Sequence, residues 1–284
     1  MMMPSPEGFE FRRRFRSLAE WTAQLRLSPH LCDAAFVGSL ARAIGRTGLY
    51  DPIDEAYAPP GEIAIEAPNY RESLVWRGMN ARQRGILAAV RGHGEMIGRP
   101  ILQSDARIYA AEAVTPFALY MRGRFPFFLG SEYATDPKTA ARLFPVPMLD
   151  LEHLDLPDAS FDTVLTNDVL EHVPHLDKAL AEVRRVLVPG GITMSTVPFA
   201  YMNQSSVVKA RVVNGAVEYL TEPEYHGNPV DPNGSLVFEI PGWDILDRMR
   251  AVGFADAWWD FVVSTRYGAI GGEIAGIFVL GGST

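Results

Sequence analysis

Polar side chains stand at the ends of three successive strand candidates in the middle of the chain. These residues are Glu132 after the first, Asp150 after the second, and Asn167 with Asp168 at the end of the third. In an open α/β sheet, ligands bind at the carboxyl ends of the strands, where a carboxylate can accept hydrogen bonds from ribose hydroxyls. Any one of these acids could equally be a solvated loop residue. Three of them in order at successive strand ends favour a nucleoside pocket.

Histidine supplies the candidates for acid–base chemistry. His226 lies in the segment Glu-Pro-Glu-Tyr-His-Gly-Asn-Pro, just past the fifth predicted strand. A histidine titrates near neutral pH, so it can take a proton from a reacting hydroxyl; the alternative is a loop histidine bonded to backbone. His172 is the second candidate, with a structural or cofactor-side role as its alternative. The histidines and acids show no recognisable metal spacing, so no metal site is expected.

The composition restricts the class of protein. Of the 284 residues, 48% are hydrophobic and 21% are charged, which is ordinary for a globular protein. The net charge of -8 argues against nucleic acid as a partner, because phosphate binding needs clustered Lys and Arg.

No apolar run approaches the roughly 18 residues of a membrane span, and no apolar signal core follows the N-terminus. We therefore expect a cytoplasmic location without membrane contact. The single Cys32 excludes an intrachain disulfide and a cysteine-rich zinc site.

The elements that position these residues divide the chain near residue 100. Residues 1–100 lack strand–helix alternation and predict a helical cap, with helices over 11–25, 34–44 and the second half of 73–90. From residue 101 to 284, strands alternate with helices, apart from a long insertion over 198–241. The expected strands are 106–111, 127–130, 146–149, 161–167, 192–197 and a final pair, 257–263 and 274–280. Such alternation predicts a mostly parallel, doubly wound sheet.

Two segments resemble a known family. Residues 154–173, Leu-Asp-Leu-Pro-Asp-Ala-Ser-Phe-Asp-Thr-Val-Leu-Thr-Asn-Asp-Val-Leu-Glu-His-Val, look like the stretch joining the third and fourth strands of class I S-adenosylmethionine-dependent methyltransferases. Residues 182–191, Glu-Val-Arg-Arg-Val-Leu-Val-Pro-Gly-Gly, resemble the helix and turn before their fifth strand. The resemblance extends over about 105–284. It implies a Rossmann-like α/β fold, a seven-stranded sheet of order 3-2-1-4-5-7-6, and S-adenosylmethionine as cofactor.

The resemblance also implies roles for individual residues. Glu132, followed by Tyr133, would hold the ribose, and Asp150 with Leu151 would border the adenine. Asn167, Asp168 and Leu170 would line the cofactor cleft.

The chain departs from the family just after the strand expected over 106–111. The family has an acid followed by Gly-x-Gly-x-Gly, whereas this chain reads Glu112-Ala113-Val114-Thr115-Pro116, without glycine. Glycine permits unusual backbone angles and a close approach to the ligand. One explanation is a different turn, in which Thr115 caps a helix begun by Pro116 and backbone N–H groups still meet the cofactor's carboxylate. The other is a decayed pocket in a structural domain.

Three arginines in the N-terminal part could bind an acidic group of a substrate. They are Arg71, Arg82 and Arg84. Ordinary salt bridges at the surface or between domains are the commoner role of such residues.

The sequence therefore predicts an enzyme of small-molecule biosynthesis that transfers a methyl group to an oxygen, or less readily a nitrogen, of a small molecule or glycan. The helical cap and the insertion would close over the acceptor and exclude water. One alternative keeps the cofactor but changes the reaction, for example to a cyclisation, since a fold does not determine chemistry. Another is a non-catalytic domain that binds a partner. A homodimer is compatible with all three.

Overall fold

The computed structural model describes residues 4–284. It contains two compact units, which are described separately. The first comprises the described residues up to Gln103 together with Trp258–Leu280, and the second comprises Ser104–Ala257 together with Gly281–Thr284. Within residues 4–284, no helix combines the length and the apolar composition needed to cross a bilayer.

Seven strands follow one another in the order β1-β14-β15-β7-β6-β4-β5. Their bounds are β1 Glu10–Phe15, β4 Ile108–Ala110, β5 Phe128–Gly130, β6 Phe161–Asn167, β7 Leu187–Thr196, β14 Asp256–Ser264 and β15 Ile277–Ser283. The pairs β4–β5, β4–β6 and β6–β7 are parallel, whereas β1 and β14 are antiparallel. The predicted α/β class with a seven-stranded sheet is confirmed, but the strand order differs from the predicted one at both edges.

The first difference is the strand expected over 146–149. The structure forms only one parallel bridge there, between Glu132 and Met148, so β5 is the edge strand. The reason is local, because Pro145 precedes the segment and Pro147 lies within it, and a proline cannot donate to a strand ladder.

The second difference is β1 at the opposite edge. The predicted helix over 11–25 is wrong in its first part, since Glu10–Phe15 pairs with β14 and buries Phe15 completely. The helix itself, α1 (Leu18–Leu27), begins after Ser17, whose side chain accepts a hydrogen bond from the Glu20 N–H. This N-cap sets the start of the helix.

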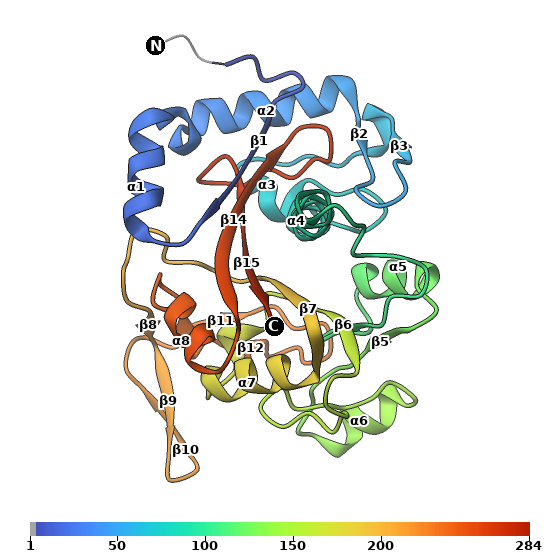
Figure 1. Cartoon of the computed structure of the whole chain (residues 1–284), viewed down its shortest axis with the longest axis vertical. Helices are drawn as coiled ribbons and strands as arrows, with labels where there is room; N and C mark the ends of the chain where they lie inside the picture. Colours follow the sequence, from blue (N-terminus) through green and yellow to red (C-terminus); the bar gives the residue numbers. More distant parts are fainter. Residues whose placement is uncertain (1–3) are drawn as a thin grey trace. The chain divides into compact units, whose positions relative to one another are not determined.

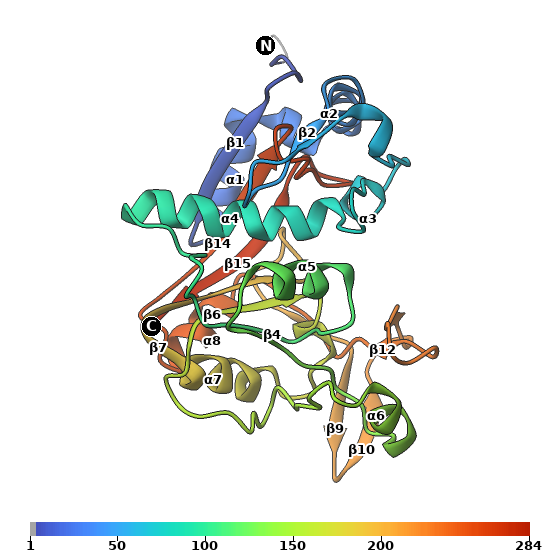
Figure 2. The ribbon, with the colours of Figure 1, turned by 90° about the vertical axis from the view of Figure 1, so that its right-hand side faces the viewer.

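The second unit has helices on both sides of its parallel strands. Figure 2 shows α5 and α7 on opposite faces of β4 and β6. The helices of this unit are α5 Pro116–Arg124, α6 Pro137–Leu143, the 3-10 turn η3 Leu170–His172, α7 Leu176–Val186 and α8 Ile245–Ala251. Helix α7 buries Leu176, Leu180 and Val183 on one face, as its periodicity predicts. Strand β6 is buried at every residue except Asp162, as expected for a strand covered on both faces.

The insertion over 198–241 forms short antiparallel pairs. They are β9 (Ala210–Val213) with β10 (Ala216–Tyr219), β11 (Tyr225–His226) with β12 (Ser235–Leu236), and β8 (Val207–Val208) with β13 (Glu239–Ile240). Figure 1 shows β9 and β10 as a projecting hairpin. The pairing of His226 with Ser235 sets the position of the candidate acid–base residue.

The first unit combines helices with a short hairpin. Its remaining elements are the 3-10 turn η1 Pro29–Cys32, α2 Ala34–Thr47, β2 Leu49–Tyr50, β3 Tyr57–Ala58, the 3-10 turn η2 Pro60–Glu62, α3 Tyr70–Ser73 and α4 Ala81–Ile97. Helix α4 begins within the predicted range, where Asn80 and Gln83 form a reciprocal capping box, but it extends beyond the predicted end to Ile97. The arginines of this region have protein partners: Arg71 and Arg82 pair with Glu72, and Arg84 is completely buried.

Candidate active site

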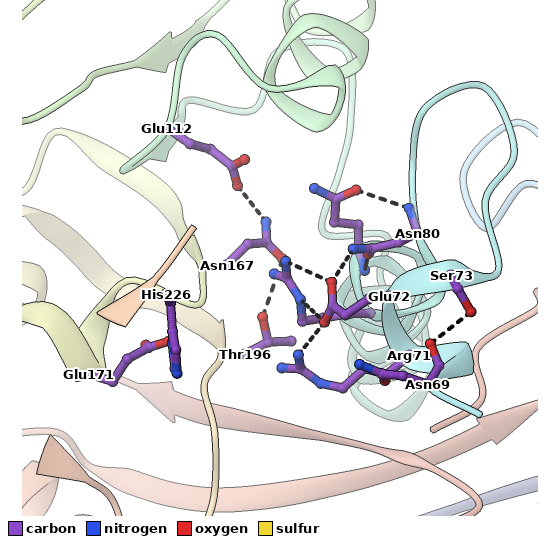
Figure 3. Close-up of polar contacts among 12 residues, drawn as sticks. Asn69, Arg71, Glu72, Ser73, Asn80, Glu112, Asn167, Glu171, Thr196 and His226 are labelled. Carbon is purple, nitrogen blue, oxygen red and sulfur yellow. Dashed lines mark hydrogen bonds and ion pairs between the residues drawn. The ribbon is translucent and has the colours of Figure 1, made fainter. Parts of the chain in front are cut away.

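Glu112 connects the ends of three strands in the second unit (Figure 3). It follows β4 and is buried. One carboxylate oxygen accepts a hydrogen bond of 2.5 Å from the Asn167 side-chain amide at the end of β6, and the other accepts one from the Thr115 hydroxyl. The Asn167 carbonyl oxygen in turn accepts a bond of 3.4 Å from the hydroxyl of Thr196 at the end of β7. The predicted residues Glu112, Thr115 and Asn167 therefore form one buried network.

Glu132, at the end of β5, binds the loop that follows β4. Its Oε1 accepts hydrogen bonds from the backbone N–H groups of Ala113 at 2.8 Å and Val114 at 3.0 Å. The side chain is buried, so these two bonds compensate for part of the desolvation of its carboxylate. The carboxylate expected to hold a ribose thus also holds the loop in which the glycines are missing.

The loop between β4 and α5 does not require glycine for its backbone conformation. None of residues 111–115 is among those with a positive φ, so alanine, valine and threonine are accommodated without strain. Thr115 caps α5, accepting a bond of 3.2 Å from the Ala118 N–H, and Pro116 is the first helical residue, as the first explanation of the missing glycines required.

The loop also passes close to the neighbouring strand, where a glycine leaves room for it. A Cβ added to Gly130 at the end of β5 would lie 2.5 Å from the Glu112 carbonyl oxygen and 3.2 Å from the Ala113 Cα. A Cβ atom does not come this close to a backbone oxygen, so a side chain at this position would displace the loop.

We expect Gly130→Ala to destabilise the protein by about 1–3 kcal/mol, the usual cost of overpacking a close contact. Urea denaturation followed by tryptophan fluorescence measures this. Gly123→Ala in α5 is the matched control, because its Cβ would meet nothing within 4 Å and alanine favours a helix. Equal stability of the two variants would contradict the proposed packing.

Three other predicted cofactor residues, Tyr133, Asp150 and Leu151, differ in their exposure to solvent. Tyr133 is 56% exposed; partial burial and the carboxylates of Asp150 and Glu152 raise the pKa of its phenol. Asp150 is exposed and accepts a bond of 2.9 Å from the Glu152 N–H. Leu151 is buried. This group therefore combines two exposed polar side chains with one buried apolar side chain.

Asp168 and Leu170 follow β6 directly. Asp168 has a left-handed backbone with φ 50, and its N–H donates to the Thr196 carbonyl oxygen at 2.9 Å. Leu170 is buried in the 3-10 turn η3. The left-handed residue turns the chain sharply at the end of the strand and leads into Glu171 and His172.

The two candidate acid–base residues meet at a buried carboxylate that sequence reasoning did not single out. His226 Nδ1 lies 3.5 Å from Glu171 Oε1, and His172 Nε2 lies 3.6 Å from the same oxygen. The two imidazole rings are perpendicular, with centroids 5.2 Å apart. Figure 3 shows the Glu171 and His226 side chains next to each other. Only the adjacency of Glu171 to His172 in the sequence could have indicated its part in this cluster.

Carboxylates control the charge of His226. Glu171, and then Glu224, whose Oε1 lies 3.0 Å from His226 Nε2, raise the pKa of His226 to about 9 against the opposing effect of burial. When no cation is bound nearby, His226 is therefore protonated at neutral pH and donates hydrogen bonds. This charge state opposes its predicted role as a proton acceptor.

Comparison with known proteins bears on the segment that carries Glu132, Asn167 and His172. A family model described as a methyltransferase domain matches residues 131–195. The resemblance to methyltransferases is confirmed. We call residues 131–195, which match this family model, the methyltransferase segment.

Curated relatives match a stretch of similar length. The ubiquinone/menaquinone biosynthesis C-methyltransferase UbiE of Ralstonia pickettii is 46% identical over 55 residues, which are 19% of this chain and 23% of that protein. The protein of the same name from Bartonella henselae is 39% identical over 67 residues, 22% of this chain and 26% of its own. The matches thus span about a quarter of the length of these relatives.

Solved structures give longer but weaker matches. The 1,6-didemethyltoxoflavin-N1-methyltransferase of Burkholderia thailandensis, solved with S-adenosylhomocysteine, has 19% identity and a TM-score of 0.40, with coverage of 72% of this chain and 78% of that one. The [4+2]-cyclase SpnF has 22% identity and a TM-score of 0.37, with coverage of 72% and 69%.

Proposed function

We propose that this chain is an S-adenosylmethionine-dependent methyltransferase that acts on an oxygen of a small molecule or glycan. The match of the methyltransferase segment carries this proposal, and the polar network at the strand ends supports it. S-adenosylmethionine, when bound, supplies an electrophilic methyl group. The chain's own residues have to hold the cofactor, orient the acceptor and exclude water, since methyl transfer depends mainly on positioning.

The residues at the strand ends suit a nucleoside. Glu132 uses Oε1 to hold the loop after β4, which leaves its second oxygen to accept hydrogen bonds from ribose hydroxyls. Leu151 offers an apolar surface for the adenine, with Tyr133 and Asp150 as polar neighbours. The N-terminus of α5, capped by Thr115, suits a negatively charged carboxylate.

The acceptor would approach the histidines that follow β6 and lie on β11. His226 and His172 stay the candidates for contact with its reacting oxygen. The second candidate function is transfer to carbon, as the name of the UbiE relatives states for those proteins; product analysis by mass spectrometry and NMR separates the two. Cytoplasmic location, a homodimer, and the cap over the acceptor remain predictions.

The first test is calorimetric titration of the purified chain with S-adenosylhomocysteine. We expect micromolar binding, abolished in Asp150→Ala because Asp150 caps the turn at the adenine side. Asp155→Ala, an exposed aspartate of the same segment, is the control and should bind as the unchanged chain does. Failure of the unchanged chain to bind at millimolar ligand would favour a non-catalytic, partner-binding domain instead.

A further inference from the structure

The cluster formed by Glu171, His172 and His226 combines burial with unusual electrostatics. The Glu171 side chain has no exposed surface, and within the described residues neither of its carboxylate oxygens makes a hydrogen bond of good geometry. The nitrogens of His226 and His172 that face Oε1 lie at 3.5 Å and 3.6 Å. An ionised carboxylate without well-placed donors is costly to bury. Protein structures compensate such a group with a cation or a metal.

The outer nitrogens of both histidines are already bonded to acceptors. His172 Nδ1 lies 2.9 Å from the Leu236 carbonyl oxygen, and His226 Nε2 lies 3.0 Å from a Glu224 carboxylate oxygen. Both partners can only accept a hydrogen bond, so these nitrogens carry the protons. In the neutral rings, the lone pairs therefore sit on His172 Nε2 and His226 Nδ1, the two nitrogens that face Glu171.

We propose that Glu171, His172 and His226 bind a divalent transition-metal ion. One ligand atom from each residue lies within 4.8 Å of the other two, and the two distances to Glu171 Oε1 are 3.5 Å and 3.6 Å. Ligand atoms that surround one cation at about 2.0–2.2 Å are about 3–3.5 Å apart. Small side-chain movements thus suffice to form the site.

The donor set determines the class of metal. Two imidazoles and one carboxylate suit Zn²⁺, Mn²⁺ or Co²⁺, whereas Mg²⁺ and Ca²⁺ prefer oxygen ligands. The hydrogen bonds to the Leu236 carbonyl and to Glu224 resemble the outer contacts that orient metal-binding histidines. Glu224 is in turn held by Lys209. The site would join the turn after β6 to β11 of the insertion.

This assignment changes the role of the histidines within the proposed function, on which that part of the inference rests. Three protein ligands leave coordination positions open, and an acceptor hydroxyl can occupy one. A histidine whose lone pair binds a cation does not accept a proton, so His226 would position the acceptor through the metal. Metal binding itself is measured without cofactor or acceptor, which separates its failure from failure of the methyl transfer.

The test uses the purified chain after EDTA treatment and dialysis. It is titrated with Zn²⁺ in a calorimeter and then with Co²⁺, which is followed in the visible spectrum. We expect one ion per chain, a Co²⁺ absorption typical of nitrogen and oxygen ligands, and an increase in melting temperature. His226→Gln should weaken binding by about 100-fold or more, since even loss of an outer contact costs 10–100-fold. His226 is about one-third exposed, so this variant should fold.

His175→Gln is the matched control, because His175 also pairs with a glutamate, Glu152, but lies outside the cluster and is 44% exposed. It should bind Zn²⁺ as the unchanged chain does. Glu171→Gln supplies a second, isosteric loss of a ligand. No Zn²⁺ binding by the unchanged chain, or equal binding by His226→Gln, Glu171→Gln and His175→Gln, would overturn the proposal.

Discussion

Replacing Glu132 by alanine is expected to weaken the binding of S-adenosylhomocysteine strongly. The substitution removes a buried carboxylate that accepts two backbone hydrogen bonds from the loop after β4 and that, in our proposal, accepts the ribose hydroxyls. Truncation of a buried, hydrogen-bonded charge at a binding site costs about 2–5 kcal/mol, which weakens binding by about 30-fold to several thousand-fold. Calorimetric titration of the variant measures the loss.

Two further variants make this prediction specific. Glu132→Gln keeps the shape and one acceptor oxygen but loses the charge, so its affinity should fall between those of the unchanged chain and of Glu132→Ala. Glu218→Ala removes an exposed glutamate of β10 and should bind normally. Undiminished binding by Glu132→Ala would exclude Glu132 from the cofactor pocket.

The largest effect on stability is expected for Arg84→Ala in the first unit. The Arg84 guanidinium is completely buried and donates to the carbonyl oxygens of Met79, Leu74, Tyr267 and Gly268, at 2.6 to 3.1 Å. Burial lowers its pKa to about 9, opposed by the charge of Asp51, so it stays charged at neutral pH. Alanine would leave the four carbonyls without this donor and create a cavity, at a cost of about 3–5 kcal/mol.

Urea denaturation checks this expectation against Arg46→Ala. Arg46 pairs with Glu7, and both side chains are more than half exposed, so its loss should change the free energy of unfolding by at most about 1 kcal/mol. Similar midpoints for the two variants would mean that Arg84 contributes no more than a surface arginine. The buried position also excludes Arg84 from the predicted role of binding an acidic substrate group.

The sequence predicted those parts of the fold whose signals are local. Strand β6 has a continuous strand pattern and formed at the expected bounds, and the apolar residues of α7 recur at helical spacing. Strand β1 was missed because its stability depends on pairing with β14, which is remote in the sequence. Phe11 and Phe15 have a spacing that also suits a helix, so periodicity alone could not decide between the two.

The candidate site shows the same division. Strand ends can be recognised in a sequence, and the network of Glu112, Glu132 and Asn167 therefore involves residues that were predicted. The cluster around Glu171 could not be predicted, because His226 reaches it only through the pairing of β11 with β12 in the insertion. The burial of Glu171 is a tertiary property that no local pattern reveals.

The position of Gly130 has a consequence for the evolution of such domains. The structural requirement at this place is a short distance between two backbones, and either backbone can lack the side chain. Here the strand lacks it, so the loop lies against the strand although it carries alanine, valine and threonine. A search that recognises this fold by its loop glycines alone will overlook chains in which the glycine lies on the neighbouring strand.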